Sequence, residues 1–88
     1  MSEIENKNKR YVVVVDRGWI FAGDMTELGD YVRLDNAVHI FKWTSIGFTG
    51  VISDPYSKGV DLRHIDTVEI PVKSVIFRIP VADGWGKS

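Results

Sequence analysis

Cysteine is absent from the 88 residues of this chain. Without it, neither a disulfide framework nor a thiolate metal site can stabilise the fold. Leucine and alanine are scarce, at 6 residues together, whereas valine and isoleucine together number 21. β-branched side chains lose rotamer freedom in helices and pack well on pleated sheets, so this ratio nearly excludes a helical bundle.

Long hydrophobic runs and an excess of either charge are also missing. The longest apolar run, YVVVV at residues 11–15, is far shorter than the roughly 20 residues that a membrane helix needs. Residues 1–10 contain no apolar stretch typical of a signal peptide, so we expect a cytoplasmic protein with no membrane partner. Eleven basic and twelve acidic residues leave a net charge of −1, which argues against a general binder of polyanions.

Short apolar segments separated by Gly, Asp and Pro run along most of the chain. We expect strands over residues 10–15, 19–25, 31–34, 37–43, 68–72 and 75–81, with another beginning at 60–62 and a polar connection at 63–66. Within 37–43, the residues Ala37, His39, Phe41 and Trp43 alternate and are expected to share one face. The pattern predicts an all-β fold, a small antiparallel barrel of about five to six strands with one long loop.

The chain divides into an N-terminal arm over 1–9, a single β-barrel domain over 10–82 and a polar tail over 83–88. A chain of this length buries only roughly 60–65% of its unfolded surface, so its core is thin. The valine run is apolar on both faces, and Trp85 is a lone aromatic in the tail. We therefore expect a homo-oligomer whose interface contains Val13, Val15 and Trp85.

The long loop over residues 44–59 is rich in glycine and hydroxyl side chains. Loops longer than ~12–15 residues are uncommon in compact domains and tend to be functional. Aromatic faces stack on bases, and arginine and glycine-rich backbone hold phosphates. The candidate ligand-binding residues on or near this loop are Trp43, Phe48, Tyr56, Arg63 and His64. For Trp43 and Phe48 the alternative is that they fill the thin core.

Candidate catalytic and metal-binding groups are sparse. Asp61, His64 and Asp66 form a D-x-x-H-x-D pattern, which can be drawn as a base with orienting carboxylates, although a solvated connection between strands is commoner for so short a motif. No serine lies in a G-x-S-x-G elbow, and no Walker or G-x-G-x-x-G sequence is present. We therefore predict that the protein is not an enzyme and holds no metal and no cofactor.

Two stretches resemble Sm-like barrels. Residues 17–43 (RGWIFAGDMTELGDYVRLDNAVHIFKW) are similar to the first half of such a barrel, where a glycine-rich strand pair leads to a V-x-L-x-N-A strand. Residues 68–79 (VEIPVKSVIFRI) resemble its closing strands. This resemblance implies an Sm/SH3-like fold for the predicted barrel.

A second resemblance, covering about residues 10–82, is to an uncharacterised family of small phage and prophage proteins. It implies a phage-encoded accessory protein acting inside a bacterium. The loop after Trp43 departs from that family by lacking its helix-like run of small residues, and Ala82 stands near a position where its members often have cysteine. The matching residues are Tyr11, Val12, Val13, Asp16, Arg17, Phe21, Gly23, Asn36, Ala37, Ile40, Trp43, Val68, Glu69, Val75, Ile76 and Ile79.

The leading hypothesis from this resemblance is a non-enzymatic anti-defence protein that binds and sequesters a nucleotide-derived immune signal. Trp43, Phe48 and Tyr56 would stack on the ligand, while Arg63 or His64 would meet its phosphate. Binding of nucleic acid is not expected from the neutral charge. The alternatives are an Sm-like RNA- or DNA-binding ring, in which Lys42 and Arg78 would gather locally, and a protein inhibitor of a host enzyme.

Overall fold

A computed structural model describes residues 9–44 and 46–87 of the chain. Its strands are β1 (Arg10–Val15), β2 (Trp19–Leu28), β3 (Tyr31–Trp43), β4 (Val60–Pro71) and β5 (Val75–Pro80). They form one antiparallel sheet in the order β4-β3-β2-β1-β5. Two 3-10 turns, η1 (Asp16–Gly18) and η2 (Val72–Ser74), join β1 to β2 and β4 to β5, and helix α1 (Phe48–Ser53) lies between β3 and β4. The predicted all-β fold is confirmed, with five strands.

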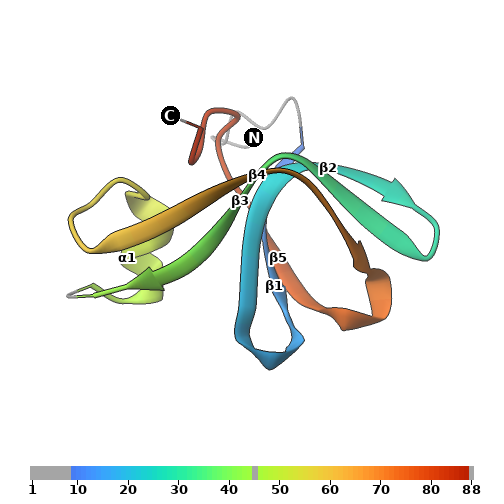
Figure 1. Cartoon of the computed structure of the whole chain (residues 1–88), viewed down its shortest axis with the longest axis horizontal. Coiled ribbons are helices and arrows are strands. Elements are labelled where there is room, and N and C mark those ends of the chain that lie inside the picture. The colour runs from blue at the N-terminus through green and yellow to red at the C-terminus, as the bar shows by residue number, and fades with distance from the viewer. Residues whose placement is uncertain (1–8, 45, 88) are drawn as a thin grey trace, which may run out of the picture.

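The long strands β2, β3 and β4 bend, so the sheet wraps round on itself (Figure 1). The wrapped sheet encloses a first core, to which β1, β3 and β4 contribute buried residues. Those residues are Val13, Val15, Val32, Leu34, Ala37 and Ile70. Val75 of β5 packs against the same cluster, so both ends of the strand order meet around it. Gly23 of β2 makes the close wrapping possible, because a Cβ there would lie 2.7 Å from Cβ of Leu34.

The other face of the sheet carries a second core, which α1 and the C-terminal tail cover. Its buried residues are Val12, Ala22, Val38, Ile40, Val51, Val81 and Trp85. The valine run therefore has both faces covered within one chain. Trp85 is only 7% exposed, and its indole Nε1–H donates to the carbonyl oxygen of Ile52 at 2.8 Å.

These contacts correct the expected oligomer interface. Val13 and Val15 lie in the first core and Trp85 in the second, so the three residues are buried in their own domain. A second subunit is not needed to cover them, because α1 and the tail supply the missing layer. The expected arm falls mostly on residues 1–8, which lie outside the described residues.

Strand β3 departs from the predicted pattern in two places. Residues 31–43 form one strand rather than two, and Asn36 inside it has a positive φ of 51°. The pairing register shifts near Asn36 and again between Ile40 and Lys42. Since each extra residue turns the following side chains to the opposite face, the four alternating residues do not share one face. Ala37 enters the first core, Trp43 packs against the second, and Phe41 is 46% exposed.

Strand β4 and the β3–β4 connection also differ from expectation. Residues 63–66, predicted as a polar connection, lie inside β4 and pair with β3. They are polar because β4 is an edge strand whose side chains there are largely exposed. The loop over 44–59 folds back over the sheet as expected, but it contains a helix, whose Val51 is fully buried. Within the described residues, no helix is long and apolar enough to cross a membrane.

Candidate functional site

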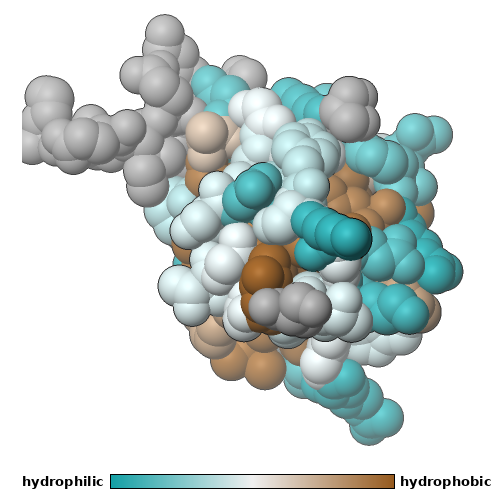
Figure 2. All heavy atoms as spheres, turned by 90° about the vertical axis from the view of Figure 1, so that its left-hand side faces the viewer, coloured by the Kyte–Doolittle hydropathy of each residue, from teal (hydrophilic) through white to brown (hydrophobic). Residues whose placement is uncertain are grey.

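The predicted loop residues Trp43, Phe48 and Tyr56 serve the packing of the loop. The rings of Trp43 and Phe48 are 5.6 Å apart, and both pack against the second core. Tyr56 is exposed, but its hydroxyl donates to the carbonyl oxygen of Lys87 at 2.8 Å and so holds the tail. On the side of the molecule where α1 lies, some hydrophobic residues are exposed among polar ones (Figure 2). The contacts favour the core-filling alternative for Trp43 and Phe48.

Arg63 and His64 are neighbours on β4, so their side chains point to opposite faces of the sheet. The guanidinium of Arg63 lies 3.7 Å from the ring centroid of Phe41. His64 instead lines a cavity near the C-terminal tail. The structure therefore brings together Trp43 and Phe48 but spreads the five predicted ligand residues over several places.

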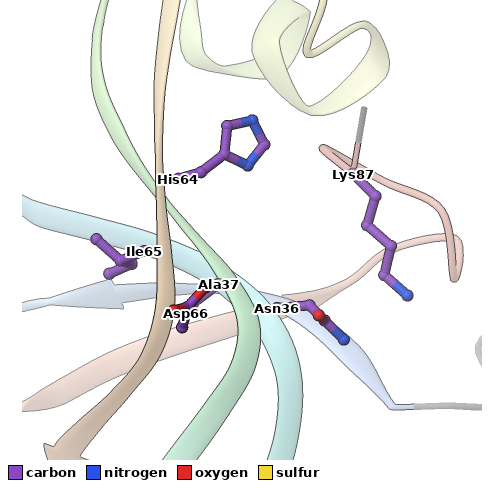
Figure 3. Close-up of a pocket in the computed structure, with 6 residues that line it drawn as sticks. All are labelled: Asn36, Ala37, His64, Ile65, Asp66 and Lys87. Carbon is purple, nitrogen blue, oxygen red and sulfur yellow. The ribbon is translucent and has the colours of Figure 1, made fainter.

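The tail cavity has a volume of about 360 Å³ and is lined by Asn36, Ala37, His64, Ile65, Asp66 and Lys87. Figure 3 shows the His64 ring on the side of β4 nearer to Lys87, whereas Ile65 points the other way. Asn36 and Lys87 already contact the carboxylate of Asp24, at 3.0 and 3.6 Å. These two polar groups of the cavity are thus used in holding the fold.

Asp24 belongs to a buried ion pair that sequence reasoning missed. Arg10 is fully buried, its Nη1 lies 3.1 Å from Oδ1 of Asp24, and its Nε–H donates to the carbonyl oxygen of Trp85. Burial raises the pKa of Asp24, but hydrogen bonds from Asn36 and Arg10 and the charges of Arg10 and Lys87 outweigh it, so its pKa lies below the ordinary value. Nothing in the sequence separates Arg10 from other charged residues at the start or end of a strand.

The structure divides the D-x-x-H-x-D residues, because His64 and Asp66 line the tail cavity and Asp61 does not. Asp61, His64 and Asp66 all lie on β4, and Asp61 is paired with Arg63 at 3.3 Å. Among the residues that the structure describes, no cluster of three or more His, Cys, Asp or Glu side chains could hold a metal ion. The motif thus lies within a strand, whereas the alternative expected for it is a solvated connection between strands.

A second cavity, here called the turn cavity, lies where the β2–β3 turn meets η2. The N–H of Val72 donates to the carbonyl oxygen of Asp30 at 2.8 Å and fixes the two segments side by side. The cavity has a volume of about 450 Å³ and is lined by Gly29, Asp30, Tyr31, Pro71, Val72 and Lys73. Tyr31 is 47% exposed, so an aromatic ring and an ammonium group are both available to a ligand.

A third region is a set of π-systems on the sheet surface that α1 leaves uncovered. This aromatic face consists of Trp19, Phe21, His39, Phe41 and Arg63. The rings of Trp19 and Phe21 are nearly parallel, at 5° and 6.0 Å between centroids. The imidazole of His39 lies 5.0 Å from Trp19, 5.2 Å from Phe21 and 5.7 Å from Phe41. Burial and then the charge of Arg63 lower the pKa of His39, which favours the neutral ring.

The outer edges of the sheet are the remaining candidate surface. Strands β4 and β5 stand at the two ends of the strand order, and within the described residues no further strand pairs with either. On β5, Ile76 is 60% exposed and Phe77 is 49% exposed. An edge strand with exposed apolar residues is a ready template for pairing with another chain.

Comparison with solved structures finds Sm proteins. A heptameric archaeal Sm protein superposes with a TM-score of 0.58 at 15% sequence identity, over 86% of this chain and 90% of that chain. The SmAP1 heptamer of P. aerophilum gives a TM-score of 0.58 at 15% identity, over 86% of this chain and 82% of that chain. The resemblance to Sm-like barrels is therefore confirmed at the level of the fold. No family model and no curated protein matches the chain, and the resemblance to small phage proteins stays a prediction.

The Arg10–Asp24 pair leads to a prediction about stability and acid. Because the pKa of Asp24 is lower in the folded chain than in the unfolded one, its contribution is present above the unfolded pKa, near 4, and is lost as the pH falls through the folded pKa. We expect Asp24→Asn to lower the free energy of unfolding at pH 7 by about 3 kcal/mol, the low end of the range for a buried pair, because Asp24 is partly exposed while the buried arginine loses a counter-charge.

Urea unfolding at pH 7 and pH 3 measures the effect, and the difference between wild type and Asp24→Asn is expected to shrink at the lower pH. Glu27→Gln is the matched control, because the Glu27–Arg78 pair is largely exposed and such pairs contribute about 0–1 kcal/mol. Equal effects of the two substitutions at pH 7 would contradict the role given to the buried pair.

Proposed function

We propose that this chain is a non-enzymatic subunit of a homo-oligomeric ring that binds single-stranded nucleic acid. The observation that carries the proposal is the open sheet, whose order β4-β3-β2-β1-β5 leaves two different strand edges on one chain. Surfaces that differ on the two sides of a subunit join head to tail, and such contacts close into a ring when the rotation between subunits permits. The fold neighbours are heptamers, which supports closure.

Exposed residues on β5 support assembly through the edges. Ile76 and Phe77 expose apolar side chains on a strand that stands at one end of the strand order. Monomeric proteins usually blunt sheet edges with charged residues, proline or a bulge. β4 carries charged residues along its length and Pro71 at its last residue, so the exposed apolar residues that favour pairing are those of β5.

The turn cavity supports the choice of nucleic acid. The half-exposed ring of Tyr31 can stack on a base, and the ammonium of Lys73 can meet a phosphate. A ring repeats this cavity once per subunit, so weak single sites add through effective concentration. The near-neutral charge argues against tight binding of any polyanion by charge alone. Stacking of bases on aromatic rings does not depend on a net positive charge, so it is compatible with this charge.

Sequestration of a nucleotide-derived signal by a phage protein stays a prediction. It needed Trp43, Phe48, Tyr56, Arg63 and His64 around one ligand, whereas these residues lie in several places. The inhibitor of a host enzyme likewise stays a prediction. The ring is preferred because the fold neighbours and the open edges both support it.

Assembly is tested by light scattering coupled to size exclusion. We expect the wild-type chain to elute at a fixed multiple of 10.0 kDa. The double substitution Ile76→Lys and Phe77→Lys is expected to give monomers, because charge on an edge strand blocks pairing. Leu28→Lys is the control, since Leu28 is 46% exposed but lies on β2, inside the strand order. A wild-type monomer at every concentration would refute the ring.

Binding is tested by fluorescence anisotropy with a mixed-sequence RNA strand of about 12 nucleotides. Tyr31→Leu is expected to weaken binding by about 5- to 100-fold, because stacking contributes about 1–3 kcal/mol per base. Tyr31→Phe keeps the ring and is expected to bind like the wild type. Lys73→Gln should reduce the slope of log K against log salt by about 0.7, the value for one phosphate contact on a single strand. Absence of binding by the wild type contradicts the proposed ligand.

A further inference from the structure

The aromatic face contributes no residue to the second core or to the turn cavity, and only Phe21 among its members packs against the first core. Its rings come from β2 and β3 and its guanidinium from β4, so three strands hold them in fixed register. Trp19 is 51% exposed and Phe41 46% exposed. Large aromatic side chains dominate the energetics of interfaces, so exposed aromatic residues held together on one surface mark an interaction site.

All five members of the face are flat π-systems, of which Trp19, Phe41 and Arg63 are exposed, whereas Phe21 and His39 are half-buried. Trp19 and Phe21 are within 5° of parallel, so a planar ligand stacked on one lies parallel to both. Phe41 stands edge-on to His39, at 83°, and the guanidinium of Arg63 covers its ring. The face therefore consists of aromatic rings and a guanidinium, on which planar groups can stack, and not of aliphatic side chains.

We propose that the aromatic face is a second binding surface of the chain for single-stranded nucleic acid, on which successive bases stack. The inference rests on the proposed function for the class of ligand, but it uses residues that the turn cavity does not contain. Each base has a π-face, so binding by stacking tolerates many sequences.

The charges around the face support nucleic acid bound mainly by its bases. Arg63 is paired with Asp61 at 3.3 Å, so its charge is balanced while its planar face stays available for stacking. A cavity of about 270 Å³ beside Phe41 is lined by Gly18 and Lys42, among others. The Lys42 ammonium is thereby placed to meet a phosphate next to a base on Phe41. The depressed pKa of His39 keeps a neutral ring in the middle of the row.

The test combines anisotropy with the fluorescence of Trp19. With the same RNA strand of about 12 nucleotides, Phe41→Leu is expected to weaken binding by about 5- to 100-fold, whereas Phe41→Tyr keeps the stacking surface and the affinity. RNA is expected to quench tryptophan emission, and Trp19→Phe should abolish the quenching while binding persists. Trp43 and Trp85 supply the background signal, because they pack in the second core. Far-UV circular dichroism verifies that each variant is folded.

The outcomes separate this inference from the proposed function. No binding by the wild type overturns both. Binding that Tyr31→Leu weakens but Phe41→Leu does not, with Trp19 emission unchanged, overturns the second surface and leaves the ring intact. Trp19 emission that changes with protein concentration in the absence of RNA, together with an unaltered affinity of Phe41→Leu, would assign the face to contacts between copies and also overturn the inference.

Discussion

Two breaks in the alternation of β3 decide which side chains meet the cores and which meet water. A strand has a side-chain period of two, so one inserted residue moves everything after it to the other face. Near Asn36 the break lets Leu34 and Ala37 enter the same core, although they are three positions apart. Beside Phe41 the second break turns Trp43 into the second core and leaves Phe41 outside. Both cores and the aromatic face depend on these breaks.

Both faces of the sheet are thus covered by residues of the same chain. Helix α1 and the tail close the second core, and the buried Arg10 ties β1 to Asp24 of β2 and to the tail carbonyl of Trp85. The unpaired backbone groups of the sheet are consequently at its edges, where β4 and β5 have no neighbouring strand on their outer side within the described residues. In the proposed ring, the β4 edge of one subunit would pair with the β5 edge of the next.

The sequence predicts the class of fold well and the site poorly, for physical reasons. The abundance of valine and isoleucine indicates a sheet, and residues 17–43 carry the likeness to Sm barrels. The breaks of β3 escape prediction because pairing with β2 and β4 creates them. Trp85 looks unpartnered because Ile52, which accepts its hydrogen bond, is 33 positions away. Arg63 and His64 are adjacent in the sequence and are therefore expected at one site. Because they lie in a strand, their side chains point to opposite faces.

Hydrogen exchange of the backbone amides of β4 and β5 tests the central claim, the pairing of these edges between subunits, most directly. In an isolated chain the outward amides of an edge strand face solvent and exchange readily. The account predicts that outward amides of both strands are protected in the wild type and lose that protection on dilution, together with the large assembly. Rapid exchange of these amides at every protein concentration, with protection confined to β1, β2 and β3, would contradict it.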